Sequence, residues 1–230
     1  MYRLNKWTAS AAPWLADDTW ETTTRSWEPT GYLAAGLDLS KTRDMSALNL
    51  TYCEDGKRFQ KTALWITEEY AEANRAKVRF HEWADRGYVT IIPGDVILIS
   101  WIKEYFASMS DDIELLVYDK TYAQEFTEWV MEQYPGIECV EFPQSPSVME
   151  GPIDGFEAAL LAGELFHDDN PCMTWQAGHC EVRENARGHR ILQKPKRGDV
   201  RKIDGLVASV MGFYGATVMP SPVSGSLFIS

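Results

Sequence analysis

Three aspartates, far apart in the chain, stand where carboxylates could do chemistry. Asp38 ends the apolar run YLAAGL, Asp119 ends the apolar run IELLVY, and Asp204 lies in the last long apolar stripe. Carboxylates that meet at a half-buried site repel one another unless a cation neutralises them, and oxygen ligands favour Mg²⁺ or Mn²⁺. Two such ions could clamp an in-line displacement at phosphorus. A metal site of this kind is therefore one hypothesis for the three acids.

The first two acids need a sheet that brings their strands together. Strand 32–38 is followed by apolar runs at 45–53 and 58–66, with DG in the turn between them, so we expect three successive antiparallel strands. The continuous apolar run at 113–119 is typical of a strand buried on both faces. If it pairs parallel with strand 32–38, the intervening hairpin and helices supply the crossover, and the two terminal aspartates meet at one edge.

Periodicity predicts the remaining elements. They are a helix capped by Thr67 with Phe80 and Trp83 on its inner face, an extended segment at 88–94, a helix at about 96–109, a helix at 121–134, a strand at 137–142, a helix at about 155–166, a hairpin at 172–194 around ENARG, and a last helix at roughly 199–216. Asp204 lies at the margin of the last helix's apolar stripe, where the small residues Gly205 and Ala208 would let the backbone approach a sheet. A surface role for Asp204 remains open at this point.

The size of the chain suits one large domain with an arm. The 230 residues are 45% hydrophobic and include 9 Trp, 10 Tyr and 9 Phe, enough to fill a substantial core. We expect an aromatic-rich linker or arm at 1–30, the folded domain at 31–216 and a flexible tail at 217–230. Four scattered cysteines suggest reduced thiols in a cytosolic protein, and we see neither a membrane span nor a secretion signal.

The charge of the chain is uneven. The formal net charge is −12, which argues against a protein coated in basic surface for nucleic acid. Residues 179–202 nevertheless hold eight Lys or Arg against three Asp or Glu. This basic strip is either a DNA contact or a solvated hairpin, and charge alone does not decide between the two.

Five local sequences, taken in order, carry a family resemblance. LDLSKTRDMSAL, VYDKTYAQEF, FPQSPSVM, AGELFHDDNPCMTW and KIDGLVASVM resemble the nuclease domain of tailed-phage large terminases, and RLNKWTASAAPWLADDTW resembles the segment that precedes that domain. The predicted element order is similar to the ribonuclease H-like fold. The resemblance implies an α/β fold, with a mixed five-stranded sheet flanked by helices and an added β-hairpin.

The same resemblance implies roles for four acids. Asp38, Asp119 and Asp204 match metal-binding catalytic aspartates, with Asp38 bridging two ions and the other two each completing one. Asp44 matches an accessory acid that some family members place beside the metals. Asp44 could equally cap a hairpin.

Six cations are candidate DNA contacts. Lys202 would be placed to touch a phosphate, and the remaining five could guide the duplex: Arg201, Arg190, Lys194, Lys196 and Arg197. For each of them, a plain surface role is the alternative.

The resemblance implies a metal-dependent endonuclease that cleaves double-stranded DNA during viral genome packaging, with two Mg²⁺ or Mn²⁺ ions per active site. Implied partners are the packaging ATPase domain or chain, the small terminase subunit and the portal. The implied location is the host-cell cytoplasm, with no membrane association and no secretion. The chain has no GxxxxGK[ST] motif, since its GK at 56–57 lies in a predicted turn, so we expect no ATP hydrolysis here.

Other interpretations compete with this one. A non-catalytic module that clamps DNA or docks on the capsid would use the same acids structurally. The opening stretch also resembles the phosphate loop of actin-like sugar kinases, but we find no second glycine-rich loop. A zinc site is a further option, although the spacings match no common finger; its ligands would come from His167, Cys172, His179 and Cys180.

Overall fold

The computed structural model describes residues 12–15, 17–26, 32–42, 44–196 and 200–219. Of the predicted arm, the described part includes Trp14 and Trp20, and both side chains are buried in the core. The predicted tail lies largely outside the described residues. Within them, no helix has both the length and the apolar character that a bilayer crossing requires.

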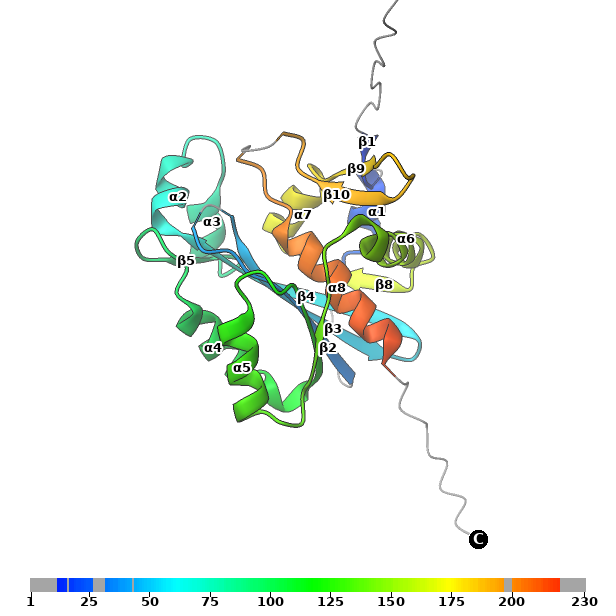
Figure 1. The fold of residues 1–230 in the computed structure, drawn as a ribbon. Helices are drawn as coiled ribbons and strands as arrows, with labels where there is room; N and C mark the ends of the chain where they lie inside the picture. The colour runs from blue at the N-terminus through cyan, green and yellow to red at the C-terminus, as the bar shows by residue number, and fades with distance from the viewer. Residues whose placement is uncertain (1–11, 16, 27–31, 43, 197–199, 220–230) are drawn as a thin grey trace, which may run out of the picture.

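A mixed sheet forms the centre of the molecule (Figure 1). Its strands follow the order β5-β4-β3-β2-β6-β7, and β8 pairs with β4. Neighbours from β4 to β2 are antiparallel, whereas β6 is parallel to β2 and β7 to β6. The strands are β2 (Tyr32–Asp38), β3 (Ser46–Glu54), β4 (Lys57–Thr67), β5 (Thr90–Ile92), β6 (Ile113–Tyr118), β7 (Glu138–Glu141) and β8 (Leu165–His167). The predicted fold class is confirmed, and the expected five strands are extended by two short ones, β5 and β8.

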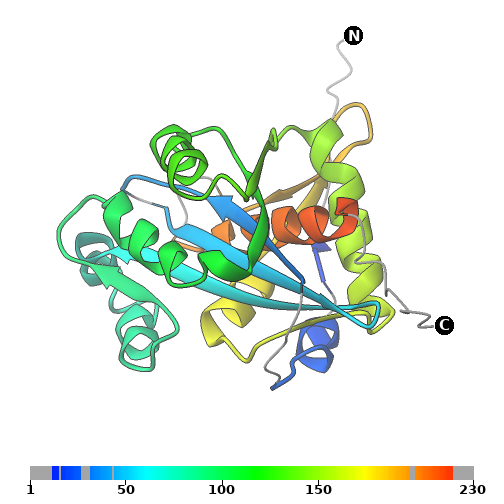
Figure 2. The ribbon, with the colours of Figure 1, turned by 90° about the horizontal axis from the view of Figure 1, so that it is seen from below.

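Helices cover both faces of this sheet. They are α1 (Asp17–Thr22), α2 (Glu68–Ala73), α3 (Phe80–Asp85), α4 (Ile99–Ala107), α5 (Gln124–Gln133), α6 (Pro146–Leu161), α7 (Pro171–Ala177) and α8 (Asp204–Val218), with a 3₁₀ turn at Ser110–Asp112. Figures 1 and 2 show α4 and α5 together on one side of the sheet, and α8 with α6 on the other. Each side has its own apolar core, with Phe106 and Phe126 in the first and Phe156 and Leu206 in the second.

Helix α8 lies unusually close to the sheet. Its residues 204 to 213 are all buried, and it packs across β2 and β3. Gly36 on β2 makes the approach possible, because a Cβ at that position would overlap the backbone of Ala208 and Gly212. A Cβ on Gly212 would in turn overlap the side chain of Asn49 on β3. The helix axis is therefore fixed against the strand that carries Asp38.

Local signals in the sequence explain two of the differences from the predicted elements. The helix expected after Thr67 is two helices, because α2 ends at Ala73 and is capped by Asn74, whose side-chain amide donates to the carbonyl of Tyr70 at 2.9 Å. The N-terminal part of the predicted hairpin is helix α7. Asn170 caps it by accepting from the backbone N–H groups of Cys172 and Met173, and Pro171 occupies its first turn.

Two other predicted helices were placed wrongly. Helix α6 begins at Pro146, well before the expected start near residue 155, and the segment expected to be its end contains strand β8. Pro152 lies inside α6, and an internal proline normally argues against helix. Helix α8 begins at Asp204 rather than near residue 199.

The predicted hairpin is confirmed where it reaches the second sheet. Strands β9 (Glu181–Glu184) and β10 (Arg190–Gln193) pair antiparallel, and β1 (Ala12–Pro13) adds to β9. Arg190 forms ion pairs with Asp154 and with Glu157, the latter at 2.6 Å. These contacts hold the hairpin on α6.

We expect Gly36→Ala to destabilise the protein by at least about 3 kcal/mol, the upper end of the usual cost of overpacking a core. The added methyl group has no room beside α8, so the helix must move away from β2. Urea unfolding monitored by circular dichroism measures the loss.

Gly178→Ala is the matched control. Gly178 is exposed at the end of α7 with a helical backbone (φ −66°), and a Cβ there would make only ordinary contacts, so alanine should be neutral or stabilising by up to about 1 kcal/mol. Equal effects at both positions would contradict the close approach of α8.

Candidate active site

The carboxyl ends of two parallel strands bring Asp38 and Asp119 together. In the register of β2 and β6, Leu37 lies opposite Tyr118, so the next residue on each strand is an aspartate at the same edge. The backbone N–H of Asp119 donates to the carbonyl of Leu37 at 3.3 Å, which extends the ladder to the acids. The predicted parallel pairing is confirmed.

Asp204 joins this edge from above the sheet. It is the first residue of α8, and only 8% of it is exposed. Because α8 crosses β2 at Gly36, the turn before that contact brings Asp204 toward the end of the strand. The carboxylate of Asp204 is close enough to raise the pKa of Asp38, and Asp119 contributes to that shift in the same direction.

Each acid has a different set of partners. Gln144 donates its side-chain amide to Asp38 Oδ1 at 3.1 Å. The backbone N–H of Thr121 donates to Asp119 Oδ1 at 2.7 Å. The buried Oδ2 of Asp204 has no hydrogen-bond partner among the described residues. One acceptor of the cluster is therefore buried without a donor.

Two lysines turn inward to the acids. The Lys194 ammonium contacts Asp44 and lies 3.7 Å from Asp204 Oδ1. The Lys202 ammonium donates to Asp44 Oδ1 at 2.9 Å and lies 4.0 Å from the ring centroid of Tyr70. Lys202 is only 2% exposed. These contacts bring Asp44 beside Asp204 through shared cations.

The pKa shifts follow from burial and neighbours. Burial, then the Asp204 carboxylate, holds the pKa of Asp38 well above its usual range. Burial also raises the pKa of Asp204, against the opposing effect of Lys194. The pKa of Asp44 is lowered because its contacts with Lys194 and Lys202 outweigh its own partial burial. The edge is thus a site where negative charge is costly and cations are favoured.

The residues at this edge fit a divalent cation. Asp38, Asp119 and Asp204 offer oxygen ligands only, the set that Mg²⁺ and Mn²⁺ prefer, and the unpartnered Oδ2 of Asp204 is a ready acceptor. In the described part of the chain, no group of three or more His, Cys, Asp or Glu side chains is arranged to hold a metal ion as it stands, so the fit lies in the chemistry of the oxygen donors. The Lys194 ammonium interacts with both Asp204 and Asp38, so it would compete with an incoming ion.

The candidate DNA contacts divide into two groups. Lys194 and Lys202 are engaged with the acids, and Arg190 is engaged with α6, so three of the six cations face the protein. Lys196 is exposed and Arg201 is partly buried. Arg197 lies outside the described residues.

Sequence reasoning gave no role to Gln144. It lies in FPQSPSVM, three residues beyond β7, and β7 is parallel to β6. The carboxyl end of a third parallel strand reaches the same edge as the first two, and that signal was available in the sequence. The possible zinc ligands have separate partners: His167 Nε2 lies 2.8 Å from the Trp20 carbonyl, and His179 Nδ1 lies 2.6 Å from that of Trp175.

Comparison with protein families decides the assignment. The family model described as the terminase large subunit, endonuclease domain, matches residues 1–219. The chain belongs to this family. The resemblance seen in the sequence motifs is thereby confirmed.

Three similar proteins place this terminase nuclease domain among known ones. Protein YmfN of Escherichia coli K12 is 27% identical over 189 residues, which are 76% of this chain and 41% of that protein. The crystal structure of the HK97 bacteriophage large terminase matches with a TM-score of 0.75 and 26% identity, covering 90% of this chain and 44% of the other. The large terminase nuclease of thermophilic phage G20c, with bound magnesium, matches with a TM-score of 0.52 and 14% identity, covering 83% and 84%. The chain spans less than half the length of the first two.

We expect Asp38→Asn to stabilise the metal-free protein. The folded protein holds a proton on Asp38 at a pH where the unfolded chain has released it, since the pKa of Asp38 is raised in the fold. The resulting penalty is absent below the ordinary pKa of aspartate and grows as the pH rises above it. At pH 7 in a chelator, the variant should gain about 2–4 °C in Tm, equivalent to about 1 kcal/mol for a domain of this size.

Asp111→Asn serves as the control, because Asp111 is an exposed aspartate in the 3₁₀ turn. Calorimetric scans of both variants between pH 5 and 8 measure the effect. A Tm for Asp38→Asn that falls below wild type across this range would show that the Asp38 carboxylate stabilises the fold.

Proposed function

We propose that this domain is a divalent-metal-dependent endonuclease that hydrolyses phosphodiester bonds of double-stranded DNA in viral genome packaging. The observation that carries the proposal is the meeting of Asp38, Asp119 and Asp204 at one sheet edge, with a buried acceptor oxygen that has no donor. The family assignment supports the reaction class.

The three aspartates are the proposed metal ligands, with Asp44 as an accessory acid. The G20c terminase nuclease binds magnesium, which supports Mg²⁺ or Mn²⁺ as the cofactor, and we propose two ions per site. When bound, such ions would neutralise developing charge on the phosphate oxygens and make water a stronger nucleophile.

The residues around these acids have positioning roles in the proposal. Gln144 fixes the orientation of Asp38, and the Thr121 backbone fixes that of Asp119. The start of α8 places the positive end of the helix dipole behind Asp204, which favours its ionised form against the cost of burial. The chain therefore holds ionisable oxygens at the edge before any cation binds.

The domain would act as one part of a packaging machine in the host-cell cytoplasm. Its partners in the proposal are DNA, a packaging ATPase domain or chain, a small terminase subunit and a portal. ATP hydrolysis would reside outside these 230 residues, in line with the missing phosphate-loop motif. On the hairpin side, Lys196 is exposed and could reach DNA, with Arg201 and Arg197 as further candidates.

Cleavage of supercoiled plasmid tests the proposed activity. With Mn²⁺ or Mg²⁺, we expect nicked and linear products that disappear in the presence of a chelator. Asp38→Asn, Asp119→Asn and Asp204→Asn should each reduce the rate at least about a hundredfold, the scale seen when one electrostatic contact to a transition state is lost. Gel electrophoresis over a time course measures the rates.

Asp111→Asn, which removes an exposed carboxylate away from the edge, should cut at the wild-type rate. Intact plasmid at high protein concentration, with either metal, would favour the non-catalytic clamping or docking module. Cutting that survives Asp38→Asn would place the reaction elsewhere.

Lys194 gives a separate test of the metal site. Removing its positive charge should tighten Mn²⁺ binding about tenfold, equivalent to about 1.4 kcal/mol, because the ammonium occupies space beside Asp204 and Asp44. Isothermal titration calorimetry with Lys194→Met measures the change. Lys196→Met is the matched control on the same segment and should change the affinity less than twofold. Weaker Mn²⁺ binding by Lys194→Met would show that the lysine supports the site instead of competing for it.

A further inference from the structure

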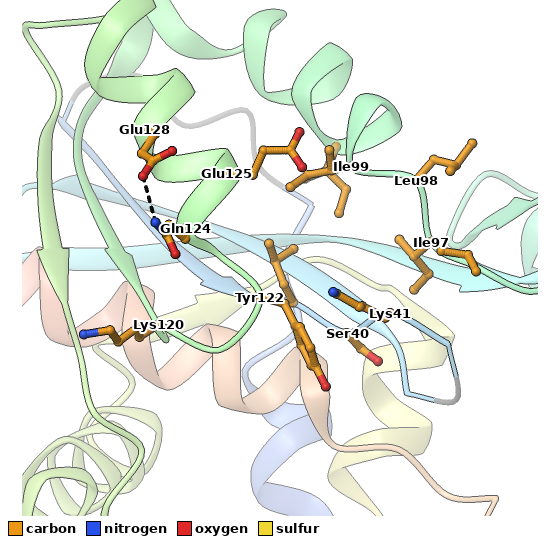
Figure 3. A pocket seen from close by; sticks show the side chains of 13 residues that line it. Ser40, Lys41, Ile97, Leu98, Ile99, Lys120, Tyr122, Gln124, Glu125 and Glu128 are labelled. Atoms are coloured by element: carbon orange, nitrogen blue, oxygen red, sulfur yellow. Dashed lines mark hydrogen bonds between the residues drawn. The ribbon is translucent and has the colours of Figure 1, made fainter.

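A hollow of about 620 Å³ opens beside the proposed catalytic edge (Figure 3). Its walls come from the segment after β2, the segment after β6 and the chain that enters α4. The first begins directly after Asp38 and the second directly after Asp119, so both walls continue from proposed metal ligands. The third is joined to the first by a hydrogen bond from the Ile97 N–H to the Lys41 carbonyl, at 2.8 Å.

The two sides of the hollow differ in charge. Figure 3 shows Lys120, Tyr122, Lys41 and Ser40 along one side, and Glu125 and Glu128 on the other. The two glutamates already have partners, since Glu125 pairs with Lys103 at 3.0 Å and Glu128 accepts from Gln124 at 2.9 Å. The two lysines on the opposite side are exposed. Lys120 also pairs with Glu141, outside the hollow, at 3.6 Å, and both side chains of this ion pair are exposed, so a phosphate could replace the glutamate at little cost. An anion entering the hollow would therefore find two exposed cations, one three residues after Asp38 and one directly after Asp119.

Tyr122 is held in an unusual conformation. Its φ is +63°, in the left-handed region that residues other than glycine rarely adopt, and the residue is 52% exposed. The next residue, Ala123, is completely buried, so the backbone turn is fixed while the tyrosine ring projects outward. The Lys41 ammonium lies 4.9 Å from the centre of that ring. A strained backbone that presents an exposed aromatic side chain is typical of a binding position.

The floor of the hollow is apolar. Leu39, Ile97 and Ile102 line it and are buried. Cations on one side and an apolar floor match a chain of phosphates joined by sugars. The location of the hollow also suits a polyanion, because a DNA strand bound at the metal site must continue across a neighbouring surface of the protein.

We propose that this hollow binds the sugar-phosphate backbone of the cleaved DNA strand beside the scissile phosphate. Lys41 and Lys120 contact phosphates, and the Tyr122 ring packs on a deoxyribose. The inference rests on the proposed nuclease function and adds a substrate subsite to it. It assigns DNA contacts to a surface other than the basic hairpin.

DNA binding without cleavage tests this subsite. The full 230-residue chain carrying Asp38→Asn is titrated, in chelator, into a fluorescein-labelled 30-base-pair duplex, and anisotropy gives Kd at several salt concentrations. The double variant Lys41→Gln/Lys120→Gln should weaken binding at least tenfold. It should also reduce the slope of log Kd against log salt concentration by about 2, since each lost phosphate contact removes about 0.9.

Lys57→Gln/Lys77→Gln removes the same charge from exposed lysines at the start of β4 and after α2. This control should bind within twofold of the parent. If both double variants bind alike, the hollow is not a DNA subsite.

Tyr122→Gly separates binding from folding. Glycine adopts the left-handed conformation without strain, so the Tm should stay equal or rise while the duplex binds at least fivefold more weakly. A lower Tm with unchanged binding would show that the ring is structural and would overturn its assigned contact.

Failure of the DNA subsite can be distinguished from failure of the nuclease function. If wild-type protein cuts plasmid and the Lys41→Gln/Lys120→Gln variant binds DNA like the control, the subsite is ruled out and the nuclease function stands. If the Lys41→Gln/Lys120→Gln variant loses DNA binding but wild-type protein never cuts plasmid, the DNA-binding surface stands and the catalytic function is ruled out.

Discussion

The contact between Gly36 and α8 is the constraint on which the site depends. β2 carries Asp38 at its end, and α8 begins with Asp204, so the separation of these two carboxylates is set by how closely the helix lies on the strand. No side chain other than hydrogen fits at Gly36. A larger residue would lift the helix and move its first turn away from the sheet edge. The geometry of the acids is thus decided two residues earlier on the strand, by packing rather than by charge.

Packing alone would leave the acids in an unfavourable state. Burial raises the pKa values of Asp38 and Asp204, and each carboxylate adds to the cost of ionising its neighbours. Lys194 and Lys202 offset part of this cost directly, because both ammonium groups act to lower the pKa of Asp204, and Asp44 holds them in place by accepting from both. The fold therefore contains its own counter-ions for these acids. This arrangement explains how the buried acids are tolerated, and why some residues expected to touch DNA face the protein.

Much of the fold could be predicted from the sequence, because strong local patterns coincide with the final structure. The apolar runs that end on Asp38 and Asp119 became parallel neighbours, and the DG turn joined β3 to β4 as expected. The errors fell where a local signal was overlooked or overridden. Asn170 and Pro171 marked a helix start inside a predicted hairpin, and Pro152 proved compatible with a helix interior.

The site could be predicted only in part, because contact between distant segments leaves little trace in one sequence. Strand ends and family motifs in the sequence pointed to the acids, and the structure has the parallel pairing that brings Asp38 and Asp119 to one edge. The inward orientation of Lys194 and Lys202 was not, since a lysine near an aspartate in sequence can equally point to solvent. Arg190 illustrates the same limit: its partners on α6 lie more than thirty residues away in the chain. Charge composition predicted a basic strip, but tertiary packing decided which of its charges remained free.

The overall charge of the molecule sets the final requirement on DNA binding. At a net charge of −12, long-range attraction to a polyanion is absent, and screening confines the remaining effects to about 10 Å at 0.1 M salt. Affinity must therefore arise from a few cations placed directly along the path of the strand. Lys41 and Lys120 would meet this condition in the proposed subsite, because they follow Asp38 by three residues and Asp119 by one, and both are exposed outside the buried cluster.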